Sequence, residues 1–290
     1  MTRSMTPFVL VAFLATAATS CQSVPTSTPS PETPGSSSDA QIVLLGEKHD
    51  NGNGHQLRAD DLRKRIQGGW RPAIAMEQFD RENQALLDAA MRECSDADCV
   101  VARAAPGKSS WDWAFYTPVI ALAMEYKLPL LAANLSRADA SKVVKGGIAS
   151  ALDAGTVNRY GLDKPVPVAV LAPQVEEVRI GHCGMLPDAM LEPMAMAQVA
   201  RDVVMADTVR PHISRGAVLI AGNGHVRRDI AVPYWLRAQG LTTWSVGYVE
   251  QPGVPGEYDL ERPITSIERA DPCAELGKTM GKPMDKTSGG

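Results

Sequence analysis

Short apolar runs bounded by turn residues recur along the chain, and segments with a helical pattern separate them. Six runs are expected to be strands: Ile42–Leu45, Ala73–Met76, Leu128–Ala132, Val166–Leu171, Ala217–Ala221 and Thr242–Val246. Their hydrophobicity is continuous rather than alternating, which is typical of strands covered on both faces. The pattern therefore predicts an α/β fold, in which a mainly parallel β-sheet is flanked by helices.

The intervening segments repeat apolar residues at helical spacing. The expected helices are one that begins near Asp80, then Trp111–Tyr126, Arg137–Leu152 and a long one from Pro187 to Arg210. On the long helix Gln198, Arg201, Asp202 and Met205 share one face. Polar residues on a mostly apolar helix need partners, and either a structural hydrogen-bond network or the lining of a site would provide them.

The first twenty residues have the pattern of a signal peptide. Arg3 precedes an apolar run at 7–18 that is too short to span a bilayer. Small residues then lead into Cys21, as in the bacterial lipobox, where such a cysteine becomes lipidated and starts the mature chain. Gln22 follows where aspartate would retain a lipoprotein in the inner membrane, so we expect an outer-membrane lipoprotein that faces the periplasm. Ordinary secretion with cleavage nearby is the alternative.

Composition divides the rest of the chain. Residues 21–39 are mostly Ser, Thr and Pro and are expected to be a disordered tether, and 277–290 are expected to be a flexible tail. Residues 40–276 are expected to be one α/β domain, since a chain of 290 residues with 44% hydrophobic residues can bury a large core. A net charge of −4 without any basic block argues against a nucleic-acid partner.

Five cysteines are present, and four remain if Cys21 carries lipid. The even remainder, in an exported protein, predicts structural disulfides among Cys94, Cys99, Cys183 and Cys273. Three pairings are possible. In one of them, Cys94 with Cys99 closes a short loop and Cys183 with Cys273 attaches the C-terminal segment.

Two strand ends carry the same short motif. Gly46-Glu47-Lys48-His49 follows the first expected strand, and Gly222-Asn223-Gly224-His225 follows the fifth. Because the carboxyl ends of parallel strands share one rim, where ligands bind in such sheets, His49 and His225 are expected to converge. Glu77 ends another strand, and His55 starts the helix after the first motif.

Common catalytic and cofactor motifs are absent. The glycine-containing loops complete neither a dinucleotide-binding nor a P-loop pattern, and there is no HExxH or GxSxG motif. These absences exclude a zincin and argue against a serine hydrolase of the α/β-hydrolase kind.

Several stretches together resemble the ChaN-like haem-binding lipoproteins, within the wider group that includes Tiki, TraB-like and erythromycin-esterase-like proteins. They are LLGEKHDNGNGH (44–55), AMEQFDREN (75–83), WDWAFYTPVI (111–120), LLAANLSR (130–137), GHCGMLP (181–187), AQVARDVVMAD (197–207) and AGNGHVRRDIAVPYWL (221–236). The resemblance implies a parallel α/β sandwich that takes part in haem or iron uptake, with dimers that hold haem between them and an outer-membrane haem receptor as a possible partner. It also implies a tyrosine directed toward the iron with help from histidine, for which Tyr116 is the candidate within the matched block.

Two functions fit these residues. In a haem-binding protein, His49, His55 and His225 would supply ligation or hydrogen bonds, and Arg137 or Arg228 would meet the propionates. In a metal-dependent or acid/base hydrolase of the Tiki or esterase kind, Glu47 and Glu77 would act as bases, and His49, His225 and Glu47 would hold a divalent metal. The lipobox and the GHCGMLP and AQVARDVVMAD stretches favour a binding protein over an enzyme.

Overall fold

The computed structural model describes residues 1–2, 40–107 and 110–274. Six parallel strands form one sheet in the order β3-β2-β4-β1-β5-β6. The strands are β1 (Ile42–Leu45), β2 (Ala73–Asp80), β3 (Leu130–Asn134), β4 (Ala217–Ile220), β5 (Thr243–Val249) and β6 (Leu260–Pro263). The expected fold class, a parallel sheet flanked by helices, is confirmed.

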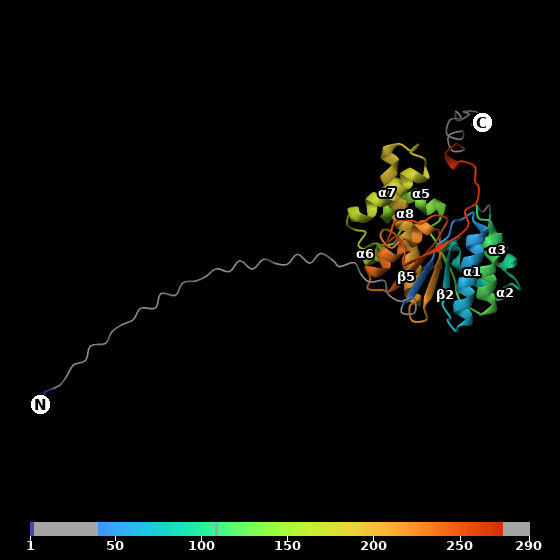
Figure 1. Cartoon of the computed structure of the whole chain (residues 1–290), viewed down its shortest axis with the longest axis horizontal. Helices are drawn as coiled ribbons and strands as arrows, with labels where there is room; N and C mark the ends of the chain where they lie inside the picture. Colours follow the sequence, from blue (N-terminus) through green and yellow to red (C-terminus); the bar gives the residue numbers. More distant parts are fainter. Residues whose placement is uncertain (3–39, 108–109, 275–290) are drawn as a thin grey trace. The chain divides into compact units, whose positions relative to one another are not determined.

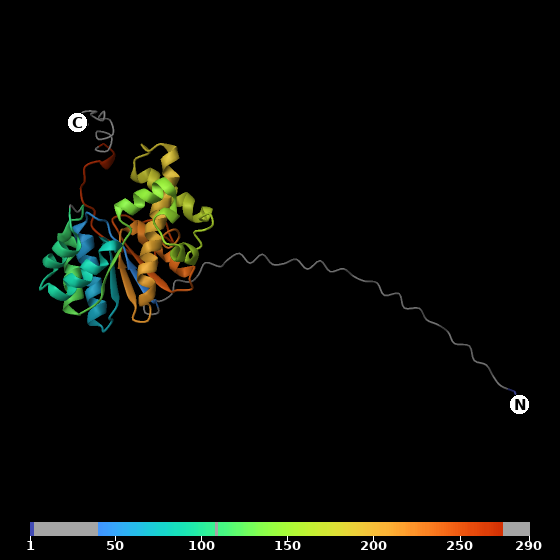
Figure 2. The ribbon, with the colours of Figure 1, turned by 180° about the vertical axis from the view of Figure 1, so that it is seen from behind.

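Helices cover both faces of this sheet (Figures 1 and 2). On one face lie α1 (Gly52–Gln67), α2 (Gln84–Glu93), α3 (Ala97–Ala104) and α4 (Thr117–Glu125). On the other lie α5 (Arg137–Gly146), α6 (Ala154–Arg159), α7 (Val168–Gly181), α8 (Asp188–Val209) and α9 (Val232–Arg237). Short 3-10 turns connect several of them, at Arg81–Asn83, Trp113–Phe115, Ile148–Ser150, Arg210–His212 and Asn223–Val226.

The central strands are apolar on both sides because each face of the sheet has its own core. In β1, Ile42 and Leu44 pack into the core beneath α8, whereas Val43 and Leu45 pack into the core beneath α1. All four side chains are buried, which explains why the sequence pattern is continuous rather than alternating.

One expected strand is wrong. Residues 166–171 do not join the sheet, because α7 begins at Val168 directly after Pro167. A short apolar run cannot by itself distinguish a buried strand from the start of a packed helix. The sixth strand is instead β6, which is partly exposed at the sheet edge and carries Glu261 and Arg262, so its hydrophobic signal is weak.

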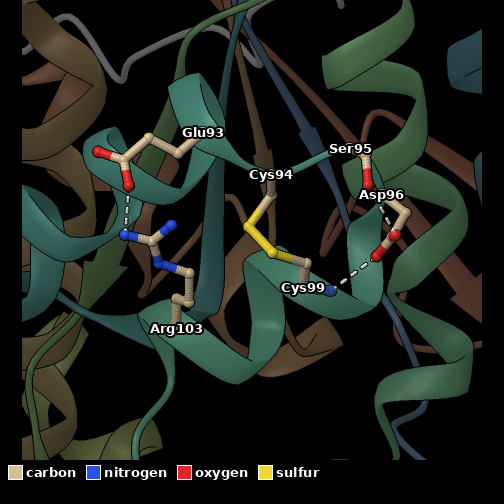
Figure 3. The surroundings of a disulfide bond; sticks show 6 residues. All are labelled: Glu93, Cys94, Ser95, Asp96, Cys99 and Arg103. Atoms are coloured by element: carbon tan, nitrogen blue, oxygen red, sulfur yellow. Dashed lines mark hydrogen bonds and ion pairs between the residues drawn. A yellow bond between two sulfur atoms is a disulfide. The ribbon is translucent and has the colours of Figure 1, made fainter.

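Two disulfides form among the four cysteines. Cys94–Cys99 joins the end of α2 to the first turns of α3, where Asp96 caps the helix by accepting from the Cys99 amide at 2.8 Å (Figure 3). Cys183–Cys273 attaches the C-terminal segment to the connection between α7 and α8. The prediction that all four cysteines form disulfides is confirmed, and these are the pairs.

Two expectations concern residues that the structure does not describe. The signal peptide, Cys21 and the tether at 21–39 lie outside the described residues, as does the tail at 277–290. Within the described ranges, no helix combines the length and apolar character needed to cross a bilayer.

Candidate functional site

The two Gly-x-x-His junctions meet at the carboxyl edge of the sheet because β1 and β4 are neighbouring parallel strands. The Asn223 amide donates to the Glu47 carbonyl at 2.9 Å. A Cβ atom on Gly46 would lie 2.2 Å from Asn223 Oδ1, and one on Gly222 would lie 2.9 Å from the His49 ring. Each glycine therefore leaves room for a side chain of the other junction, and this explains why both junctions need glycine.

Glu47 is the centre of a buried polar cluster behind the first junction. Its Oε1 accepts from the Tyr116 hydroxyl at 2.6 Å and from Gln78 Nε2 at 3.3 Å. Its Oε2 forms an ion pair with Arg58, whose side chain is fully buried on α1. Burial lowers the pKa of Arg58 to about 10, and the adjacent carboxylate supplies the charge partner that a buried guanidinium requires.

His49 lies in front of this cluster and is accessible. Its Nδ1 lies 2.9 Å from Glu47 Oε1, and half of its side chain is exposed. Because the carboxylate accepts at Nδ1, the neutral ring carries its proton there and keeps Nε2 as the free acceptor. Burial lowers the pKa of His49, and the nearby His225 acts in the same direction, although Glu77 opposes both.

His225 lies at the second junction between two carboxylates. Its Nδ1 is 2.6 Å from Asp202 Oδ1 on α8, and its Nε2 is 3.7 Å from Glu77 Oε1. Burial on its own would lower the pKa of His225, but Glu77 and Asp202 outweigh it and raise the pKa. Burial likewise raises the pKa of Asp202, to about 6, despite the opposing charge of His225.

A cavity of about 590 Å³ opens beside these junctions. It is lined by His49, Glu77, Gln78, Asp80, Asn83, Ala105, Pro106, Ser110, Trp111, Trp113, Asn134, Arg137 and Arg201. His49 and Glu77 thus face the same space. This volume is in the range of small-molecule and cofactor sites, and the two tryptophans provide apolar surface.

Other expected site residues lie elsewhere. Tyr116 is fully buried behind His49, and none of the cavity residues is a tyrosine. His55 is also buried, with its Nε2 at 2.9 Å from the His49 carbonyl and its ring stacked on Phe115. Arg228 forms an ion pair with Asp259 at 2.9 Å and does not line the cavity, whereas Arg137 does.

The alternative metal site has no support in this geometry. Within residues 40–107 and 110–274, no three His, Cys, Asp or Glu side chains are grouped so that they could hold a metal ion. Glu47 is surrounded by Arg58, Tyr116 and Gln78, so its oxygens face donors from the protein itself.

Three residues of the site were not assigned from sequence. Arg58 looks like an ordinary polar residue of an amphipathic helix, and only its position three residues after His55 hints at a shared network. Asp202 and Arg201 were noticed on the long helix, but their partners come from distant parts of the chain. In the structure Asp202 is hydrogen-bonded to His225, while Arg201 faces the cavity.

The fold and the cavity together define an α/β domain with a ligand site at the carboxyl ends of its strands. Residues 35–236 match the family described as haem-binding uptake, Tiki superfamily, ChaN. The match covers well over half of the chain, so this protein belongs to that family.

A solved structure shares this fold. The ChaN of Campylobacter jejuni, described as binding haem cofacially, has a TM-score of 0.60 at 20% identity over 76% of this chain and 86% of that one. A mutant erythromycin esterase in its open conformation gives a TM-score of 0.41 at 13% identity, over 76% of this chain and 75% of that one. No protein with a curated description matches the chain.

Proposed function

We propose that this protein binds haem in the cavity beside the two junctions, with His49 as the residue that faces the iron. The observation that carries the proposal is the accessible His49 ring, whose Nδ1 is held by the buried Glu47 carboxylate. Histidines that ligate metals are commonly oriented in this way by a carboxylate at the other ring nitrogen.

The residues of the cavity fit haem. The tryptophans at 111 and 113 supply apolar walls, and the guanidinium groups of Arg137 and Arg201 supply positive charge for propionates. Haem would bring an iron that takes an imidazole ligand; the protein residues bind, orient and shield it. Since no tyrosine lines this cavity, His49 is a better candidate than Tyr116 for the iron-facing residue.

The cellular role we propose is haem or iron uptake by an outer-membrane lipoprotein. It rests on the sequence pattern around Cys21, the tether at 21–39 and membership of the ChaN family. The protein would be attached to the outer membrane through lipid on Cys21 and face the periplasm. A haem-bridged homodimer and an outer-membrane haem receptor are the partners this role would involve.

Titration of the purified domain with haemin, followed by the Soret band, tests haem binding. A Glu47→Gln variant is expected to lower affinity about tenfold to a hundredfold, as for other residues that orient a metal ligand. His49→Ala should lower it further and shift the band, whereas His212→Ala, which alters a histidine outside the cavity, should match the wild type. His225 does not line this cavity, but its junction packs against that of His49, so the effects of His49→Ala and His225→Ala are expected to be less than additive.

The hydrolase alternative has one supporting observation: Glu77 and His49 line the same cavity. A carboxylate and an imidazole in one cavity can act as general acid and base. Absence of a Soret band in the wild type, together with an esterase activity that both His49→Ala and Glu77→Gln abolish, would favour the hydrolase over the haem protein.

A further inference from the structure

We propose that the wall of the cavity formed by α5 and α8 is a carboxylate-binding site, in which Arg201 is the principal cation and Arg137 the second. Arg137 is the first residue of α5, and Arg201 lies in the middle of α8; both line the cavity. The inference rests on the proposed function, because the carboxylates would be the propionates of haem.

Neither guanidinium has a hydrogen-bond or ion-pair partner within the described part of the chain. Arg201 and Arg137 form no ion pair or hydrogen bond there, and Arg201 Nε is buried without an acceptor. Arg227, by contrast, is paired and lies 2.6 Å from Glu177 and 2.8 Å from Asp229. A partly buried guanidinium without an acceptor is costly, so a bound anion would compensate Arg201.

The acidic residues of the cavity do not fill this need. Glu77 accepts from the Gly222 amide at 2.7 Å and faces His225, whose pKa is raised. Asp80 accepts from Asn134 Nδ2 at 2.7 Å, and burial raises its pKa. Both carboxylates therefore already have donors. Arg201 acts on Asp80 through its charge but donates no hydrogen bond to it, so the buried Nε of Arg201 still lacks an acceptor.

The start of α5 adds to the positive potential of this wall. Arg137 is at its first turn, and the Ser136 side chain caps it by accepting from the Asp139 amide at 3.3 Å. The N-terminus of a helix favours a nearby anion through its dipole. A flat apolar ligand with carboxylates on one edge would place its body along the tryptophans and its carboxylates toward the arginines. A guanidinium group binds a carboxylate through two parallel N–H donors.

The proposal corrects the choice of arginines made from sequence. Arg137 and Arg228 were the expected propionate partners. Arg228 is already paired with Asp259, which is 4% exposed, so its charge is compensated within the protein. Arg201 takes its place.

The test compares haemin with haemin dimethyl ester, in which both propionates are uncharged, in Soret titrations of full-length protein. Wild type is expected to bind haemin about tenfold to a hundredfold more tightly than the ester, the factor for one or two charge-assisted contacts. Arg201→Gln should lose that preference while its affinity for the ester stays unchanged. Arg137→Gln should lose less because Arg137 is exposed. Arg201→Lys should recover part of the preference for haemin, since lysine restores the positive charge but not the paired N–H donors of a guanidinium.

Arg92→Gln is the matched control, because Arg92 is an exposed arginine of α2 that does not line the cavity. Far-UV circular dichroism should be unchanged in all variants, and the urea midpoint of Arg201→Gln should be no lower than that of the wild type, because the substitution removes a buried donor without an acceptor. Equal affinity of the wild type for haemin and the ester, or equal loss of both in Arg201→Gln, would overturn the carboxylate site and leave haem binding standing. A wild type that binds neither form would overturn the proposed function itself, and this site with it.

Discussion

The two Gly-x-x-His junctions share a sequence pattern and lie on neighbouring strands, yet their histidines occupy opposite environments. The side chain of His49 is 50% exposed, has a carboxylate on one ring nitrogen and has a lowered pKa. That of His225 is 14% exposed, lies between Asp202 and Glu77, and has a raised pKa. The same motif thus provides an accessible imidazole with a lowered pKa at one strand end and a largely covered imidazole with a raised pKa at the next.

The contrast arises from what lies behind each histidine. Behind His49, the carboxylate of Glu47 is itself compensated by Arg58, so its charge is not available to hold a proton on the imidazole. Behind His225, Asp202 has an amide donor in Gln174 at 3.0 Å, and its charge is compensated chiefly by the imidazole. Whether the adjacent carboxylate has a cation of its own therefore separates the histidine with the lowered pKa from the histidine with the raised pKa.

The largest expected effect comes from removing the compensation behind His49. Arg58→Met leaves the buried Glu47 carboxylate without its cation and should lower the free energy of unfolding by about 3–5 kcal/mol. Urea denaturation measures this loss. The double variant Arg58→Met with Glu47→Gln should recover most of it, and a double variant as unstable as the single one would contradict the ion-pair explanation.

A smaller effect is expected behind His225. Asp202→Asn keeps an oxygen for the imidazole but removes the charge, so it should cost about 1.5–3 kcal/mol of stability. In NMR titrations the pKa of His225 should fall toward its ordinary value, while that of His49 should remain low. An unchanged pKa at His225 would show that Glu77 alone is responsible for the raised value.

Packing between the junctions can be altered at one glycine at a time. Gly222→Ala places a methyl group against the half-exposed His49 ring, which can move, so we expect about 1 kcal/mol of destabilisation, the low end for overpacking. Its main consequence should be weaker haemin binding, because His49 is displaced. Gly224→Ala is the control, since a Cβ there meets no atom within 4 Å, and it should leave both stability and binding unchanged.

The smallest effect is a difference in pH dependence, for which only the sign is predicted. His225 has a pKa above the ordinary 6.5 when folded, so its stabilising contribution is full below that value and is lost as pH rises through the folded pKa. His49 has a pKa below 6.5, so its contribution is present above that value and is lost as pH falls. Denaturation of His225→Gln and His49→Gln near pH 6 and near pH 8 should therefore give opposite trends relative to the wild type.

The sheet and its rim could be predicted from sequence, because buried parallel strands have a direct signature in continuous apolar runs. The motifs after β1 and β4 were recognisable since each follows such a run. Residues 166–171 were misassigned because their apolar run has the same length as a strand, and β6 was missed because its residues are partly exposed and polar.

The partners of the histidines could not be predicted in the same way. Arg58 and Glu47 are near each other in sequence, but their ion pair depends on how α1 packs behind β1. Asp202 and His225 come from α8 and the loop after β4, and Arg201 reaches the cavity through the packing of α8 against β2 and β3. Such pairs depend on packing between elements, for which a single sequence carries no periodic signal.

The strand order has a consequence for how the protein acquires its site. β4 lies between β1 and β2, so the two strands that are synthesised first are not neighbours in the finished sheet. Their shared neighbour is made only after α8, and Arg269, near the C-terminus, then binds Asp50 beside His49 with Nη2 to Oδ1 at 2.8 Å. Contacts between such distant parts of a chain form late and slowly. A nascent or truncated chain that ends before residue 217 therefore contains every residue that lines the cavity but lacks β4 and the second junction, against which the turn of His49 packs. The cavity takes its final form only when the last quarter of the polypeptide has been made.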